Sequence, residues 1–191
     1  MTDELQKLFG PPARVKLLRL FLFNPRSAYT LPDAAKRARV PDEEAHREIA
    51  LFARIGLVER TKRAPVRWGL NTHFEYVAAL QNLLLNAPAR SRDIVARIRA
   101  AGAFKLVILS GIFVGEWEGR LDLFLVGDRI KERKLRECIR ALEAEIGKEV
   151  RYALLLSEDF LYRLNMNDKL VRDVLDYSHR IVLDRLGTGL K

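Results

Sequence analysis

The stretch LSGIFVGEWEGRLDLFLVG, residues 109–127, places two apolar segments on either side of a glycine-rich, acidic turn. Short apolar runs bounded by glycines are typical of buried β-strands, so the stretch predicts two consecutive strands joined by this turn. The second strand carries one carboxylate, Asp122. Since alternate residues of a strand point to the same face, Arg120 and Asp122 are expected to lie together on one face. The opposite face is expected to carry three core leucines, Leu121, Leu123 and Leu125.

The segments that follow predict the rest of an α+β module spanning residues 103–191. Residues 131–148 are charged, with apolar residues at helical spacing, and the apolar run after them predicts a third strand that ends at Ser157. Residues 158–177 predict a helical stretch with this serine as its N-cap, and 180–184 a last short strand. This order of elements predicts helices packed on a small mixed sheet. The inward residues of the charged helix are expected to be Leu135, Cys138, Ile139, Leu142 and Ile146.

The sequence VILSGIF, then GE, then LDLFLVGD, followed by a helix and a strand, resembles the minimal nucleotidyltransferase fold. The resemblance implies a Gly-Ser pair after the first strand that holds nucleotide phosphates. It also implies two aspartates, one residue apart on the next strand, that hold Mg²⁺. In this chain Gly111 matches the glycine and Gly115 and Glu116 match the turn, but Ile112 stands in place of the serine.

The metal-binding aspartates are the point where this chain departs most from that family. Arg120 stands in place of the first aspartate, only Asp122 matches the pair, and residues 150–153 of the third strand add no acid. A guanidinium beside the remaining carboxylate would neutralise it, and Mg²⁺ with bound phosphates usually needs about two carboxylates. We therefore predict a catalytically inactive domain with no metal and no cofactor. Its degenerate nucleotide site comprises Gly111, Gly115, Glu116, Arg120 and Asp122.

Three interpretations of this degenerate site stay open. In the first, Arg120 and Asp122 pair with each other and close the pocket. In the second, Arg120 and the nearby glycines receive a phosphate-bearing effector without turning it over. In the third, Glu116 and Glu118 replace the missing aspartate as metal ligands.

The first third of the chain predicts three helices followed by a hairpin. Thr30 is the expected N-cap of the second helix and Asp42 that of the third, which Gly56 ends in a left-handed conformation. After Gly56 the spacing of apolar residues changes from a period of about 3.6 to one of 2. The segments 57–61 and 66–70 therefore predict two strands joined by a basic turn.

The phrase LFARIGLVERTKRAPVRWGLN, residues 51–71, resembles winged helix-turn-helix regulators related to the ArsR group, and the resemblance covers residues 8–72. It implies that the third helix enters the major groove of DNA and that the hairpin approaches the flanking backbone. Residues 1–90 hold 15 Lys and Arg against 9 Asp and Glu, while residues 91–191 hold 19 against 16. Because phosphate attraction needs positive charge within reach, the DNA-binding candidates are the basic residues of the third helix and the hairpin. They are Arg47, Arg54, Arg60, Lys62, Arg63 and Arg67.

Three carboxylates at the start of the third helix, Asp42, Glu43 and Glu44, argue against this interpretation. They favour the helix dipole, but they would repel the phosphates of DNA. Winged helices also dock proteins, so a protein partner stays open as the alternative.

Residues 73–102 predict two helices with more aliphatic surface than a connector needs. These helices either pack between the two domains or form a homodimer, which would allow two DNA half-sites to be read. The predicted domains are the winged helix at 1–72, the helical connector at 73–102 and the nucleotidyltransferase-like domain at 103–191.

The composition is that of a globular protein, with 49% hydrophobic residues, 31% charged residues and a net charge of +9. No apolar run approaches the roughly 20 residues that span a bilayer. The N-terminal Met-Thr-Asp-Glu-Leu lacks the order of a secretion signal, so we expect a cytoplasmic protein with no membrane contact. The single cysteine, Cys138, and the three histidines show no metal-ligand spacing.

These patterns predict a DNA-binding transcriptional regulator whose inactive nucleotidyltransferase-like domain serves dimerisation, effector sensing or partner binding. The expected partners are double-stranded DNA and a second copy of the chain. Two alternatives are a Mg²⁺-dependent nucleotidyltransferase and an antitoxin-like protein-interaction module.

Overall fold

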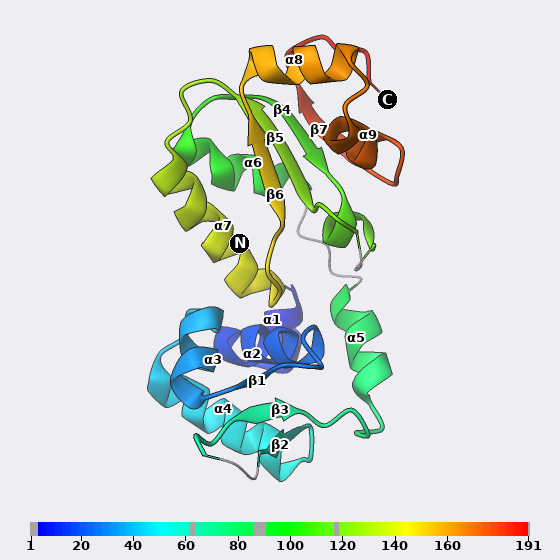
Figure 1. Cartoon of the computed structure of the whole chain (residues 1–191). Helices are drawn as coiled ribbons and strands as arrows, with labels where there is room; N and C mark the ends of the chain where they lie inside the picture. The colour runs from blue at the N-terminus through cyan, green and yellow to red at the C-terminus, as the bar shows by residue number, and fades with distance from the viewer. Residues whose placement is uncertain (1–3, 62–63, 86–90, 117–118, 191) are drawn as a thin grey trace. The chain divides into compact units, whose positions relative to one another are not determined.

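The computed structural model describes residues 4–61, 64–85, 91–116 and 119–190. The chain forms two compact units, of which the first contains residues 1–87 and 141–149 and the second residues 88–140 and 150–191. Within the described ranges there are nine α-helices and two small sheets, of three and four strands, which confirms the predicted α+β class (Figure 1). No helix in those ranges has the length and apolarity of a membrane-spanning segment.

The first unit contains three short strands and most of the N-terminal helices. Its helices are α1 (Glu4–Phe9), α2 (Pro12–Leu22), α3 (Leu31–Ala38), α4 (Asp42–Arg54) and α5 (Val77–Leu85). Its strands, β1 (Ala28–Tyr29), β2 (Val58–Arg60) and β3 (Trp68–Leu70), pair antiparallel in the order β1-β3-β2. The hairpin of β2 and β3 lies where the sequence predicts it. The sequence did not predict β1, because two residues are too few to show an alternating pattern.

The ends of α3 and α4 follow local sequence rules in part. Thr30 caps α3 as predicted, since its Oγ1 accepts a hydrogen bond from the Asp33 N–H at 3.3 Å. The prediction that Asp42 caps α4 is wrong, because extended Pro41 takes the N-cap position and Asp42 is the first helical residue. Its carboxylate still lies in the first turn, where the helix dipole favours it. Gly56 follows α4 with a φ of +81°, the predicted left-handed ending.

The core of the first unit is built around Phe21 of α2. Its ring meets Phe52 of α4 edge-on with centroids 6.5 Å apart, and Tyr29 of β1 at 6.0 Å. All three residues are buried, and edge-to-face pairs of this kind add to the free energy gained by burial. α2 therefore packs against both α4 and β1. Because the face of α4 that carries Phe52 is buried against α2, the opposite face of α4 is exposed.

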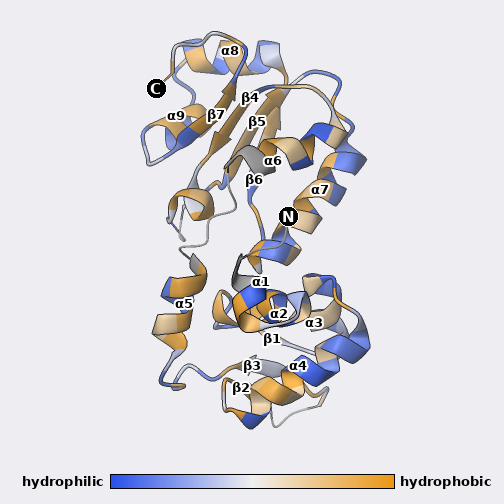
Figure 2. Cartoon of the chain, turned by 180° about the vertical axis from the view of Figure 1, so that it is seen from behind, coloured by the Kyte–Doolittle hydropathy of each residue, from blue (hydrophilic) through white to orange (hydrophobic). Residues whose placement is uncertain are grey.

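The second unit is built on a mixed sheet with strand order β6-β5-β4-β7. β4 (Phe104–Leu109) pairs antiparallel with β5 (Leu123–Gly127) and β7 (Arg180–Asp184), whereas β5 and β6 (Tyr152–Leu155) are parallel. β5 is apolar along its whole length, and β4 is apolar except for Lys105 (Figure 2). Such nearly continuous apolar strands are typical of a sheet covered on both faces. Its helices are α6 (Ser91–Ile98), α8 (Ser157–Asn165), α9 (Lys169–Leu175) and the first part of α7 (Glu132–Ile146).

Both faces of this sheet are covered by helices. Phe124 of β5 and Phe160 of α8 pack in one cluster with Val171 and Val174 of α9. Figures 1 and 2 show α6 on the opposite face. In α7, Leu135, Ile139 and Leu142 are buried as predicted, whereas Cys138 and Ile146 are partly exposed.

The helical stretch predicted for residues 158–177 is divided in two. Asn167 adopts a φ of +51°, and Asp168 then caps α9 by accepting the Leu170 N–H at 3.0 Å. Ser157 is the first residue of α8 and not its cap, so that prediction is wrong. Asp128 instead accepts both the Ser157 N–H at 3.0 Å and its Oγ–H at 2.9 Å. The Lys105 ammonium at 2.6 Å and these two hydrogen bonds lower the pKa of Asp128 to about 2.

The lowered pKa of Asp128 predicts an acid-sensitive start of α8. Its pKa falls from 3.8 to about 2 on folding, so its stabilising effect is complete above pH 3.8 and is lost as the pH falls towards about 2. The protection factors of the α8 amides, which are their exchange rates corrected for the intrinsic pH dependence of exchange, should therefore fall across this window in the wild type. In Asp128→Asn the protection factors should change less across the same window. The control Asp159→Asn, an exposed acid of the same helix, should keep the wild-type pH dependence.

The left-handed Gly56 predicts a second effect on stability. A Cβ at this position meets nothing within 4 Å, so Gly56→Ala tests backbone strain alone. Because an L-residue in this conformation costs about 1–2 kcal/mol, the variant should lower the free energy of unfolding of the first unit by about 1 kcal/mol. Urea titration measures the loss. Gly69→Ala is the control, since its Cβ would make only an ordinary contact at 3.5 Å. Equal midpoints for both variants would contradict the assignment.

Candidate functional site

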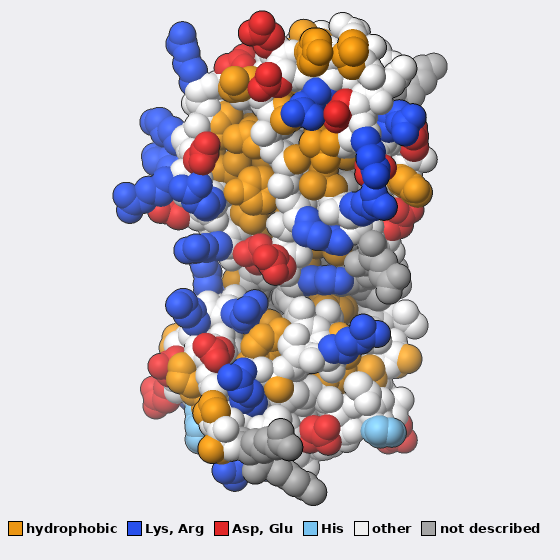
Figure 3. Space-filling model, in the orientation of Figure 1, with side chains coloured by type: hydrophobic (Ala, Val, Ile, Leu, Met, Phe, Trp, Pro, Cys, Tyr) orange, Lys and Arg blue, Asp and Glu red, His pale blue; other side chains and the backbone are white. Residues whose placement is uncertain are grey.

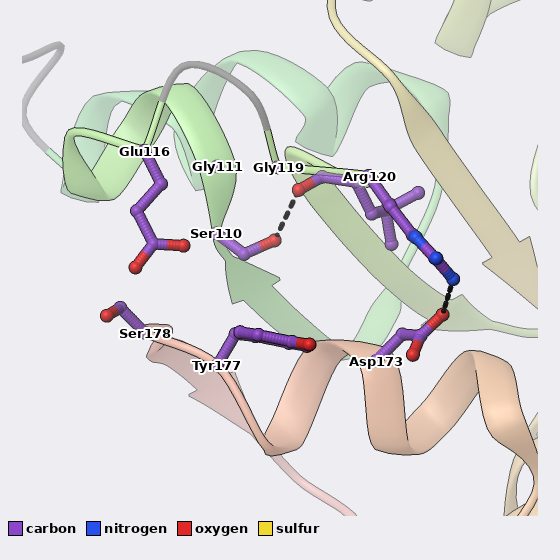
Figure 4. A pocket seen from close by; sticks show the side chains of 9 residues that line it. Ser110, Gly111, Glu116, Gly119, Arg120, Asp173, Tyr177 and Ser178 are labelled. Carbon is purple, nitrogen blue, oxygen red and sulfur yellow. Dashed lines mark hydrogen bonds and ion pairs between the residues drawn. The ribbon is translucent and has the colours of Figure 1, made fainter.

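The second unit has a cavity of about 480 Å³ beside the end of β4. Its walls are the turn after β4, the residues just before β5, and α9 with the residues that follow it (Figure 4). Ligand pockets usually enclose roughly 300–1,000 Å³, so the cavity has room for a small organic molecule. Among its lining residues are Ser110, Gly111, Glu116, Arg120, Asp173 and Tyr177.

The turn after β4 is shaped by a glycine without room for a side chain. Gly111 begins the 3₁₀ turn Gly111–Val114 with a φ of +51°. A Cβ added there would collide with Asp122 Oδ1 and would lie 2.7 Å from the Leu121 carbonyl oxygen. Ser110, the residue before it, donates its Oγ–H to the same carbonyl at 2.8 Å. The close approach of the turn to residues 121 and 122 therefore requires glycine at position 111.

The Asp122 carboxylate lies behind this turn and is fully buried. Its Oδ1 accepts the Ile112 N–H at 3.0 Å and Arg151 Nη2–H at 2.9 Å. Its Oδ2 accepts the Arg151 N–H at 2.8 Å and Arg151 Nε–H at 2.9 Å. The hydrogen bonds that the Arg151 guanidinium donates to Asp122 raise its pKa above the usual value of arginine. With two hydrogen bonds on each oxygen, the carboxylate has no acceptor site left over for another ligand.

The predicted pair between Arg120 and Asp122 is wrong. Arg120 Nη1 donates instead to Asp173 Oδ2 of α9, at 3.0 Å. β5 begins only at Leu123, so the alternation of a strand does not fix the direction of Arg120. Arg151 reaches Asp122 because the parallel register sets Leu123 opposite Tyr152, which places the two preceding residues side by side.

Three of the five residues predicted for the degenerate site line the cavity, namely Gly111, Glu116 and Arg120. Gly115 ends the 3₁₀ turn with a φ of +90° and does not line it. Glu118, considered as an alternative metal ligand, lies outside the described residues. Within the described ranges, no three His, Cys, Asp or Glu side chains gather as a metal site would require.

Sequence reasoning missed several residues of this site. They are Ser110, Arg151, Asp173, Tyr177 and Ser178. Ser110 could have been found from the sequence, because Ser110 and Gly111 form a Ser-Gly pair. This is the reverse of the Gly-Ser pair of the minimal nucleotidyltransferases that the sequence resembles. The other four come from segments far along the chain, and no local spacing connects them with the turn.

The first unit exposes the four DNA-binding candidates that the structure describes. Arg47 and Arg54 of α4 are exposed, as are Arg60 at the end of β2 and Arg67 before β3. The Thr61 N–H donates to the Arg67 carbonyl at 2.9 Å, and the Arg67 N–H donates to Thr61 Oγ1 at 3.1 Å, which joins the two sides of the hairpin. Lys62 and Arg63, the other two candidates, lie outside the described residues.

Two arginines of α7 form ion pairs with acidic residues of the same helix. Figure 3 shows Lys and Arg side chains together with acidic ones over this helix. Arg133 pairs with Glu137 at 3.4 Å and Arg136 with Glu132 at 3.1 Å. Such i,i+4 pairs balance charge along the helix, whereas Arg60 and Arg67 form no ion pair with any described residue. We therefore expect α7 to attract phosphates less than the hairpin does.

Comparison of the chain with protein-family models, with curated proteins and with solved structures found no match.

The burial of Asp122 predicts that its ion pair with Arg151 contributes much more to the free energy of unfolding than the pair between Arg120 and Asp173 does. Asp122→Ala leaves the Arg151 guanidinium and two backbone N–H groups without their acceptor. Breaking a buried pair in this way costs about 3–5 kcal/mol, and since Arg151 is 38% exposed we expect about 3 kcal/mol. Asp173→Ala breaks the pair with Arg120, which is 73% exposed, and should cost less than about 1 kcal/mol. Chemical denaturation of both variants measures the difference, and equal losses would contradict the assignment of Asp122.

Proposed function

We propose that this chain is a DNA-binding regulator. Residues 1–72, in its first unit, form a winged helix that contacts the phosphate backbone. Residues 103–191, most of which lie in its second unit, form a catalytically inactive relative of the minimal nucleotidyltransferases. The proposal rests chiefly on one observation, the exposed arginines of the hairpin and of α4 in the first unit.

The order of elements in the first unit supports a winged helix. α2, β1, α3 and α4 are followed by the hairpin of β2 and β3, and β3 lies between β1 and β2 in the sheet. α3 and α4 are separated by residues 39–41, with Arg39 in a left-handed conformation at a φ of +50°. Two helices joined by so short a turn are typical of helix-turn-helix motifs, in which the second helix reads the major groove.

The position of the cations supports contact with phosphates. Arg60 and Arg67 flank the hairpin turn, and α4 packs against β2, so the hairpin adjoins the helix that carries Arg47 and Arg54. Asp42 and Glu43, at the start of α4, are exposed and would repel phosphates. Backbone contacts through the hairpin and the later turns of α4 therefore fit the charges better than base contacts through the first turn.

The same acidic first turn favours a second candidate function. A winged helix that docks a basic protein surface would use Asp42 and Glu43 as part of its interface. This antitoxin-like function predicts no binding to DNA even at low salt, where the regulator should bind most tightly.

The state of Asp122 supports an inactive second unit. A divalent ion with bound phosphates usually takes about two carboxylates from the protein. Asp122 would have to release Arg151 and two N–H groups before it could ligate a metal, and position 120 offers a guanidinium. A second copy of the chain, which would present two winged helices to two half-sites, is part of this proposal.

The charge of the hairpin predicts the outcome of a DNA-binding experiment. Replacing Arg60 and Arg67 together with glutamate should weaken binding to all DNA sequences about equally, because phosphate contacts carry no sequence information. Each lost phosphate contact lowers the slope of log K against log salt by about 0.9, so the slope should fall by about 1 to 2. Fluorescence anisotropy at several salt concentrations measures both effects.

The control for this experiment has the same change in net charge elsewhere. Arg133→Glu together with Arg136→Glu alters α7, whose arginines already pair with acids. This control should retain the wild-type salt slope. Loss of binding in both double variants would show an effect of net charge alone. Unchanged binding in the hairpin variant would show that the hairpin is not part of the DNA-binding surface.

A further inference from the structure

The Glu116 carboxylate gives the cavity an excess negative charge. Of the charged side chains that line the cavity in the described part of the chain, Arg120 and Asp173 already form a pair at 3.0 Å. The carboxylate of Glu116 has no hydrogen bond or ion pair with any residue that the structure describes, although its backbone N–H and carbonyl are hydrogen-bonded within the turn. The lining therefore carries a formal charge of −1, and that charge lies on Glu116.

The turn after β4 does not provide a cradle for phosphate. Turns that bind phosphate present free backbone N–H groups to its oxygens. Here the Ile112 N–H donates to Asp122, the Phe113 N–H to the Ser110 carbonyl at 3.0 Å, and the Glu116 N–H to the Gly111 carbonyl at 2.8 Å. An anion in the cavity would find these donors in use and would face two carboxylates. Electrostatics therefore favour a cation over the phosphate-bearing effector, which is one of the three interpretations that the sequence leaves open.

The groups around Glu116 suit an ammonium ion. Figure 4 shows the Glu116 carboxylate and the Ser178 hydroxyl on one side of the cavity, with the Tyr177 side chain beside them. A protonated amine has N–H donors for which carboxylate and hydroxyl oxygens are acceptors, and the face of a tyrosine ring attracts cations. A divalent metal needs several such ligands, and the described residues provide no cluster of three.

We propose that this cavity binds a small organic cation, a protonated amine, with Glu116 as its counter-ion and Ser178 and Tyr177 as its polar and aromatic neighbours. The inference uses residues of the second unit only. Its test involves no DNA, so its failure and the failure of the proposed DNA binding are distinguishable.

The test compares two probes of nearly equal shape on the full chain. Benzylamine is protonated at neutral pH, whereas benzyl alcohol is neutral. In a protein NMR titration, benzylamine should shift the backbone amides of Gly111, Glu116 and Ser178 in a saturable manner below about 10 mM. Benzyl alcohol should bind at least about tenfold more weakly, because it lacks the charge that Glu116 compensates.

Two variants separate a cation site from a phosphate site. Glu116→Gln should weaken benzylamine binding about tenfold, whereas Glu158→Gln, an exposed acid of α8 outside the cavity, should leave it unchanged. Arg120→Gln releases Asp173 and makes the cavity more negative, so amine binding should become tighter. A phosphate site would instead lose affinity in Arg120→Gln.

Three results would each overturn the proposal. One is the absence of saturable shifts with benzylamine up to about 10 mM. Another is equal binding of benzylamine and benzyl alcohol, which would show a pocket without charge preference. The third is binding of ATP or pyrophosphate at these amides that is tighter than benzylamine binding and is lost in Arg120→Gln.

Discussion

The pair between Asp122 and Arg151 is the interaction on which the second unit depends. Asp122 is fully buried, and its four hydrogen bonds join the residue before β5 to the turn after β4 and to the residue before β6. A buried carboxylate is tolerated only when donors replace the water that it loses, and here two backbone N–H groups and a guanidinium do so. The same carboxylate fills the space in which a side chain at position 111 would lie.

This pair also determines the charge of the cavity in front of it. Because Arg151 neutralises Asp122 from behind the turn, Arg120 is available to Asp173 on α9. That second pair connects the residues before β5 with the helix on the other side of the cavity. Glu116 is then the lining acid without a partner among the described residues, which makes the cavity attractive to cations. The preference of the cavity for cations thus follows from the pairing of Asp122 with Arg151 and of Asp173 with Arg120.

Features set by neighbouring residues could be predicted from the sequence, and those set by tertiary register could not. The cap at Thr30, the left-handed Gly56 and the strands β4 and β5 follow from local spacing. Arg151 is paired with Asp122 by the parallel register of β5 and β6, which are separated in the chain by a whole helix. The spacing of apolar residues in the sequence gives no information on the register between β5 and β6. The sequence therefore indicated Arg120, two residues from Asp122, as the partner of Asp122, and this was wrong. Asp173 and Tyr177 were missed for the same reason.

Under the proposed function, the loss of metal chemistry has two separate physical causes. One is the guanidinium at position 120, which the family resemblance identifies. The other is Arg151, of which the sequence shows only that it is not an acid. An aspartate at position 120 would supply the missing carboxylate, yet it would leave Asp122 bound to Arg151 and to two N–H groups. A metal would still have to displace a guanidinium held by two hydrogen bonds at a buried carboxylate, where charge pairs attract more strongly than in water. Under the proposed function, a carboxylate at position 120 would therefore not restore a metal site while Arg151 remains bound to Asp122.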